Sequence, residues 1–168
     1  MNKSLPIIVS FVAGIILTFW IASDLISQHQ VPSLQEFMAI QEATSTQYMN
    51  MASTTIRAPK GKIHGLIAND DLSREKGLSG RGSISSDTGM IFYFDEPGNY
   101  SFWMKDMLMP IDIVWIDQKK TVVGIVENIS PWTFPDKFMP PKPIKYVLEL
   151  NLGGAKNFGI ATGTILVF

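Results

Sequence analysis

The sequence predicts a mainly β fold, a compact sandwich or small barrel with one or two short helices, preceded by an N-terminal transmembrane helix. Three observations carry this prediction. Six or seven short apolar stretches follow one another, separated by turn residues at modest spacing, which is typical of sandwiches and barrels. Helical patterns are few and short. The chain of 168 residues also begins with one long uncharged apolar stretch.

That first stretch, Leu5 to Ala22, reaches the lower end of the roughly 17–25 residues that a spanning helix needs. A cleaved signal has a shorter apolar core and small residues at its cleavage site, where this chain has the large Ile21. An uncleaved anchor is therefore favoured over a signal that would leave a secreted protein, and over a buried core helix. Lys3 before the stretch and Asp24 after it place the N-terminus in the cytoplasm and the domain outside the cell membrane.

The chain is expected to divide into an anchor or signal (1–23), a polar stalk (24–56) and a β domain (57–168). The stalk region is rich in Ser, Thr, Gln, Met and Ala, which suits a loosely helical or disordered spacer. A helix that docks on the domain or self-associates is the alternative. The residues that would give it an apolar edge are Leu34, Phe37, Met38 and Gln41.

Within the domain, turn and breaker residues delimit the elements. Asn69 or Asp70 is expected to cap a short helix over 69–76 that ends at Gly77, and 153–159 forms a second short helix or a turn. Turns are expected at 96–99 and 118–120, and the five prolines within 131–143 predict a semi-rigid loop. The predicted strands are 62–68, 89–94, 101–105, 111–116, 121–129, 146–150 and 163–168.

Composition excludes several kinds of function. With 14 basic and 15 acidic residues the formal net charge is −1, so no basic field is available for a nucleic-acid partner. The chain has no Cys, which excludes disulfides, thiolate catalysis and zinc–thiolate sites. His64 is the only His in the domain, and a metal site formed from His64, Asp112 and Glu149 lacks a motif of closely spaced ligands. We therefore predict no cofactor and no metal.

The most informative stretch is Phe102 to Asp117, FWMKDMLMPIDIVWID, where charged residues interrupt apolar strands. A charge inside such a strand is costly unless it is paired or hydrogen-bonded, so Lys105, Asp106 and Asp112 need an explanation. Pro110 lacks an amide donor and is expected to divide the stretch into two strands.

Several motifs in order resemble the domain of unknown function 192 family of bacteria and archaea, over roughly residues 62–168. The resemblance implies a compact, mainly β domain of jelly-roll-like character with no established activity. Ser79, Asp106-Met107 and His64-Gly65 depart from the usual pattern, and Asp106 adds a charge where the family usually has Asn. The motifs are GLSGR (77–81), GMIFYF (89–94), FWMKDMLMPIDIVWID (102–117), Pro131, YVLELNLGG (146–154) and GIATGTILVF (159–168).

Charged and aromatic residues in or beside these motifs are the candidate binding site: Arg81, Trp103, Lys105, Asp112, Pro131, Trp132 and Glu149. Side-chain alternation points Asp112 and Glu149 away from their apolar neighbours, which predicts a solvated face. A second structural interpretation pairs them with Arg81 or Lys105 as buried ion pairs. The functional interpretation is a polar cluster at the floor of an aromatic pocket. The walls of that pocket would be Trp103, Met104, Trp132 and Phe134.

The proline-rich loop also has two interpretations. It is either a rigid cover whose Trp132, Phe134 and Phe138 fill a gap in the core, or an exposed aromatic rim that contacts a glycan, a peptide or a partner protein.

The sequence thus favours a membrane-anchored extracytoplasmic domain that binds a small ligand, glycan or protein and is not an enzyme. One alternative is a cell-envelope hydrolase that uses Asp112 and Glu149 as paired carboxylates. That alternative requires both carboxylates to face the same layer of the fold. A purely structural envelope domain is the other alternative.

Overall fold

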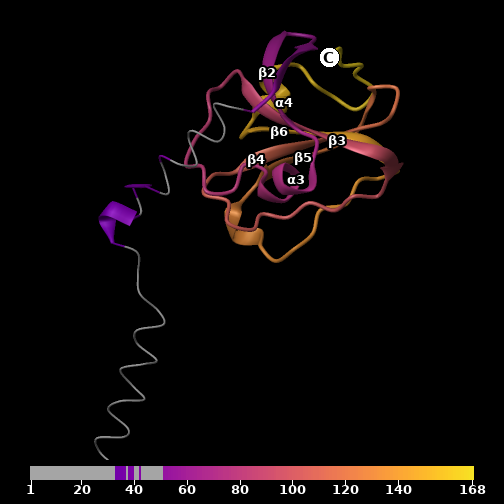
Figure 1. Cartoon of the computed structure of the whole chain (residues 1–168). Coiled ribbons are helices and arrows are strands. Elements are labelled where there is room, and N and C mark those ends of the chain that lie inside the picture. The colour runs from indigo at the N-terminus through magenta and orange to yellow at the C-terminus, as the bar shows by residue number, and fades with distance from the viewer. Residues whose placement is uncertain (1–32, 37, 40–41, 43–50) are drawn as a thin grey trace, which may run out of the picture. The chain divides into compact units, whose positions relative to one another are not determined.

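The computed structural model describes residues 33–36, 38, 39, 42 and 51–168 (Figure 1). The chain divides into two units, Met1–Glu42 and Ala43–Phe168. In the first unit, residues 34–36, 38, 39 and 42 are helical. The predicted transmembrane helix, Leu5 to Ala22, lies outside the described residues. Among the residues that are described, no helix has the length and apolar character needed to span a bilayer.

The second unit is built on one sheet with the strand order β1-β2-β3-β6-β4-β5. Its neighbouring strands are antiparallel except β2 and β3, which run parallel because helix α3 (Asp71–Lys76) crosses between them. The strands are β1 (Ser53–Ala58), β2 (Gly61–Ala68), β3 (Thr88–Gly98), β4 (Ile111–Ile116), β5 (Val122–Ile129) and β6 (Ile144–Asn151).

The predicted fold class is confirmed in its broad terms: the unit is mainly β with few short helices. The sheet is open, however, so the expected barrel is wrong. Figure 1 shows α3 and α4 (Gly154–Asn157) on opposite sides of the sheet, and a 3₁₀ helix, Pro131–Thr133, begins the proline-rich loop.

The predicted final strand, 163–168, is wrong. Strand β1 was not predicted, and most of its residues fall in the segment expected to be the stalk (24–56). The final residues make only two isolated antiparallel bridges, Arg57 with Val167 and Thr121 with Ile165. The same segment therefore bonds to β1, at one edge of the sheet, and to the residue just before β5, at the other edge. Of the six residues in β1, only Ile56 is fully buried.

Residues 101–105 were also expected to be a strand, and they are not. Phe102 makes a single bridge to Phe138, and the chain then turns through Asp106, whose φ of 56° lies in the left-handed region. The backbone here bonds to the GLSGR segment instead of a strand: the Ser79 hydroxyl donates to the Lys105 carbonyl (2.9 Å) and the Gly80 amide to the Asp106 carbonyl (2.8 Å). Asn and Asp tolerate this conformation, which explains why this position suits either residue.

The predicted turn at 96–99 is wrong in part, because β3 continues through Pro97 to Gly98 with an irregular register after Tyr93. Tyr100 then folds back, and its ring stacks on Phe94 with centroids 3.7 Å apart. The Tyr100 hydroxyl donates to the Glu96 carbonyl at 2.8 Å, which holds the ring in place.

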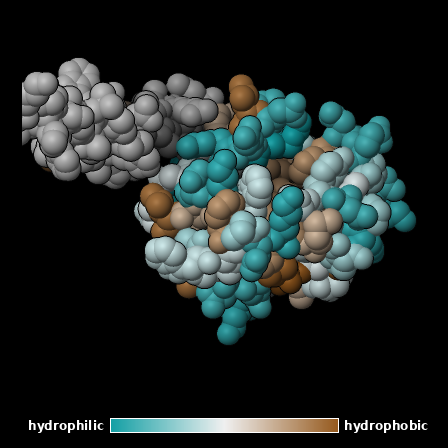
Figure 2. Space-filling view, turned by 90° about the horizontal axis from the view of Figure 1, so that it is seen from below, coloured by the Kyte–Doolittle hydropathy of each residue, from teal (hydrophilic) through white to brown (hydrophobic). Residues whose placement is uncertain are grey.

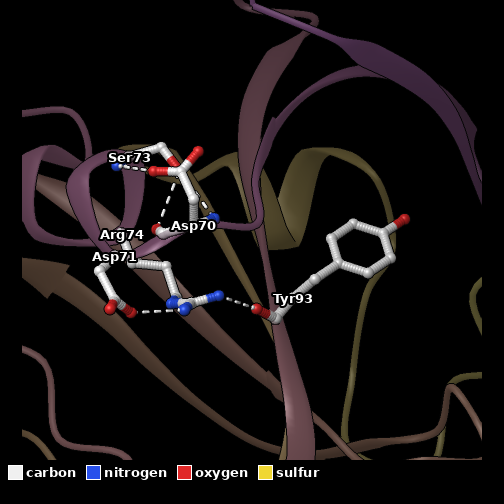
Figure 3. Close-up of polar contacts among 5 residues, drawn as sticks. All are labelled: Asp70, Asp71, Ser73, Arg74 and Tyr93. Carbon is white, nitrogen blue, oxygen red and sulfur yellow. Dashed lines mark hydrogen bonds and ion pairs between the residues drawn. The ribbon is translucent and has the colours of Figure 1, made fainter.

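Helix α3 is confirmed, with Asp70 as its N-cap. The Asp70 carboxylate accepts from the Ser73 amide (2.8 Å) and the Ser73 hydroxyl lies 3.2 Å from the Asp70 amide, so the two form a capping box (Figure 3). Arg74 donates to Asp71 (2.7 Å) and to the Tyr93 carbonyl on β3 (2.9 Å). These bonds fix the short helix against the sheet, and Gly77 ends it with a φ of +48°.

Both faces of the sheet are covered, so all six residues of β4 are buried. The face on the α3 side packs around Met90, Phe92, Ile113, Trp115 and Val147. The face on the α4 side packs around Ile63, Ile91, Val114, Leu148 and Leu150, closed by Ala155 and Leu166. A strand buried on both faces has no solvated side for its charged residues, and this decides how Asp112 and Glu149 must be interpreted.

Candidate ligand-binding pocket

Asp112 and Glu149 lie on adjacent strands but on opposite faces of the sheet. Asp112 pairs with Leu150 and Ile113 pairs with Glu149, and residues directly opposite each other point to the same side. Glu149 therefore shares a face with Ile113, and Asp112 shares the other face with Leu150. The hydrolase alternative, in which both carboxylates act on one bond, is wrong because the sheet lies between them.

The solvated-face interpretation is wrong as well. Asp112 is 0% exposed and Glu149 is 4% exposed. Within the described part of the chain, Lys105 lies within ion-pairing distance of neither carboxylate, so the pairing of Asp112 or Glu149 with Lys105 is wrong.

Asp112 has a structural explanation. Its two oxygens accept from the Asn128 amide (2.9 Å) and the Ala155 amide (3.1 Å). Asn128, with a φ of 55°, lies in a bulge of β5, and Ala155 lies in the first turn of α4, whose cap residue Gly153 has no side chain to offer. Amides at a bulge or a helix start have no partner within their own element. The Asp112 side chain, inside the sheet, therefore accepts hydrogen bonds from two backbone amides that would otherwise have no partner.

Glu149 is buried without an equivalent set of partners. The Leu78 amide donates to its carboxyl group, but Oε2 has no hydrogen-bond partner. Removal from water raises the pKa of Glu149 from its ordinary value of 4.5 to about 8, and the Leu78 amide opposes this only in part. Glu149 is thus protonated at neutral pH, and its carboxyl can both donate and accept.

Glu149 lines a pocket of about 490 Å³ on the α3 side of the sheet. The Phe92 and Phe102 rings in its wall meet edge to face at 5.0 Å, and the stacked Phe94 and Tyr100 rings form the adjoining wall. Met107 and the half-exposed Trp103 also line the pocket. A hollow with aromatic walls and a few polar groups is the usual composition of a small-molecule site.

Basic side chains surround this pocket. Arg74 and Lys76 come from α3, and Lys137 comes from the proline-rich loop. The Lys137 Nζ lies 5.6 Å from the centroid of the Trp103 ring, and the Arg74 guanidinium lies 5.6 Å from the Phe94 centroid. Glu75 is the only carboxylate that lines the pocket besides Glu149.

A smaller hollow of about 280 Å³ adjoins the first, and Glu75, Lys76, Ser79 and Trp103 line both. Lys105 and Asp106 belong to this second hollow, and the Lys105 Nζ lies 5.9 Å from the Trp103 centroid. Trp103 therefore stands between the two hollows.

The other predicted site residues lie elsewhere. Arg81, Pro131 and Trp132 line neither hollow, and Met104 is buried in the core. Trp132 is 93% exposed, so it does not fill a gap in the core. Phe134 is half-exposed, and the centroid of its ring lies 6.1 Å from the centroid of the Trp103 ring. In the view of Figure 2, hydrophobic side chains form separate areas between hydrophilic ones, not one continuous apolar surface.

Of the residues proposed from the sequence, the structure thus brings Trp103 and Glu149 together in one pocket, with Lys105 next to it. The pocket residues that were not predicted from the sequence include Arg74, Lys76, Phe92, Phe94, Tyr100, Phe102, Met107 and Lys137. Strand alternation within GMIFYF could have placed Phe92 and Phe94 on one face. Among the described residues, no three His, Asp or Glu side chains gather as a possible metal site.

The described unit is thus a mainly β domain with a pocket on one face of its sheet. A profile of the family described as "DUF192: Uncharacterized ACR" matches residues 38–168, so the chain belongs to this family of unknown function. None of the curated proteins matches the chain.

Crystal structures similar to the chain include the following two. A Sinorhizobium meliloti 1021 protein described as a "putative transcription regulator" is 32% identical with a TM-score of 0.66, over 70% of this chain and 94% of that one. A protein of unknown function from Novosphingobium aromaticivorans DSM 12444 is 27% identical with a TM-score of 0.63, over 70% of this chain and 85% of that one.

Proposed function

We propose that the domain is a binding module whose ligand is a small, largely apolar organic molecule held in the pocket beside Glu149. The observation that carries this is the unpartnered Oε2 of a buried carboxyl group in the wall of an aromatic hollow. A buried polar atom without a partner costs about 1–3 kcal/mol, and a ligand group that bonds to it removes that cost.

Binding at the pocket can be followed at Met107, which lines it, and compared with Met139, which is exposed and lines neither hollow. The full chain would be labelled with ε-¹³C-methionine, with the Met107 resonance assigned from Met107→Leu. The probes are 3-phenylpropanamide, 3-phenylpropionate and 3-phenylpropylamine, which share one apolar body. We expect saturable shifts at Met107 and none at Met139.

A pair of variants makes the test specific. Ser101 lines the pocket, so Ser101→Trp fills part of it and should abolish the shift, whereas Ser83→Trp, on an exposed residue outside both hollows, should retain it. The proposal fails if no probe moves Met107, or if Ser101→Trp binds as well as the parent chain. A purely structural domain would give the first of these results.

We further propose that the domain is held at the cell membrane by Leu5 to Ala22 and faces the extracytoplasmic side. The apolar length of this stretch and Lys3 before it support this proposal. Recovery of the chain in the soluble fraction of disrupted cells would contradict the anchor and leave the cleaved-signal alternative. That the chain binds no nucleic acid stays a prediction from its balanced charge.

A further inference from the structure

The charges around the pocket point to the class of ligand, an inference that depends on the proposed binding function. We infer that the ligand is an amphipathic organic anion, whose apolar body lies among the aromatic rings and whose carboxylate or similar group lies near Lys76 and Lys137.

The residues that line the pocket include more cations than anions. Arg74, Lys76 and Lys137 supply three cations, and Glu75 and Glu149 are the only acidic residues. Because Glu149 is largely protonated at neutral pH, Glu75 alone opposes the three cations. The lining therefore carries a net positive charge, although the whole chain has a formal net charge of −1.

Two of these three cations remain available to bind a ligand. The guanidinium of Arg74 is bonded to Asp71 and to the Tyr93 carbonyl, so it is held in the structure of α3 and β3. Lys76 and Lys137, in the described part of the chain, have no carboxylate within ion-pairing distance. Ammonium groups placed at an apolar hollow without a counter-charge favour an anionic partner.

Glu149 also disfavours a cationic ligand. If the ligand were a cation, it would bond to an ionised Glu149, and ionisation in this apolar environment is costly. A protonated carboxyl donates a hydrogen bond to a carbonyl, ether or hydroxyl oxygen instead. The pocket is thus suited to a molecule with a neutral acceptor at its inner end and an anionic group at its outer end.

The three probes that share the phenylpropyl body separate these possibilities. At pH 7 and low salt we expect 3-phenylpropionate to bind about fivefold more tightly than 3-phenylpropanamide, and 3-phenylpropylamine to bind most weakly. Raising the salt concentration to about 0.5 M should remove most of the advantage of the carboxylate and leave the amide unchanged.

Variants then assign the effect to named cations. Lys76→Gln and Lys137→Gln should each weaken binding of the carboxylate about two- to fivefold without changing that of the amide. Lys142→Gln, on the same loop as Lys137 but outside both hollows, is the matched control and should change neither.

The outcomes distinguish this inference from the binding function on which it depends. If the amide and the carboxylate bind equally and the lysine variants have no effect, the pocket binds ligands but the anion inference is wrong. If the amine binds most tightly, Glu149 acts as a carboxylate and the inference is reversed. If no probe moves Met107, the binding function itself fails.

Discussion

Asp112 and Glu149 are a useful comparison because they are alike in almost every respect except their partners. Each is a buried carboxyl on an interior strand of one sheet, and the two strands, β4 and β6, are paired with each other. Asp112 accepts from two backbone amides, whereas Glu149 accepts from one and keeps an oxygen without a partner beside a pocket. Burial alone therefore does not distinguish the two carboxyls, but their hydrogen bonds do.

The largest expected effect is the loss of stability on replacing Asp112. Asp112→Ala should lower the free energy of unfolding by about 3–5 kcal/mol, since two charge-assisted bonds are lost and two donors are left buried. Urea unfolding of the full chain measures this. Asp117→Ala is the control, because Asp117 also accepts from two amides, those of Lys119 and Thr121, but at a half-exposed turn. An equal loss in both variants would contradict the role of burial.

Next in size is the pH dependence that Glu149 imposes. Its pKa is higher in the folded chain (about 8) than its ordinary value of 4.5, so the folded state binds the proton more tightly. Stability from this group is complete below about pH 4.5 and falls as the pH rises to about 8, by on the order of 1 kcal/mol per pH unit.

Glu149→Gln removes the titration, so its stability relative to the parent chain should increase progressively from pH 5 to about pH 8 and level off above that pH. Unfolding curves at several pH values in this range give the difference directly. Glu127→Gln, on an exposed residue of β5, controls for loss of a surface carboxylate. A difference between Glu149→Gln and the parent that does not change with pH would show that Glu149 is ionised throughout.

The smallest expected effect is that of replacing Trp132, which lies outside both the pocket and the interior of the sheet. Trp132 was proposed as a site residue, but it is 93% exposed and lines neither hollow. Trp132→Ala should change the free energy of unfolding by less than about 0.5 kcal/mol and leave the probe-induced shift at Met107 intact. Loss of that shift would extend the site onto the proline-rich loop.

Most of the strands could be predicted because their apolar runs and turn residues are local signals. The interior strands β3, β4 and β6 were expected close to where they lie, and so was α3 with its cap at Asp70. Strand β1 was missed because Ser53, Thr54 and Thr55 are polar and only Ile56 is fully buried. Its β-branched residues were the available signal.

The candidate site could be predicted only in part, because it depends on pairings between distant parts of the chain. Alternation shows that Asp112 and Glu149 each point away from their neighbours, but only the register of β4 against β6 shows that they face opposite sides. Likewise, no local pattern places Tyr100 on Phe94, or Lys137 over Trp103. Trp103 and Glu149 were proposed as binding residues because of their positions within family motifs, whereas the cations of α3 lie outside those motifs.

The C-terminal segment has a consequence for the order in which the domain can form. Val167 bonds to Arg57 in β1, and Ile165 bridges to Thr121 before β5, so two distant parts of the sheet share one partner. These contacts join residues about 110 and 45 positions apart, and contacts of such long range slow folding. During synthesis the outer edge of β1 near Arg57 would lack this partner until Val167 has left the ribosome, although β1 itself is made more than a hundred residues earlier. An unpaired strand edge is prone to join other chains, so this interval is when the domain is most exposed to aggregation.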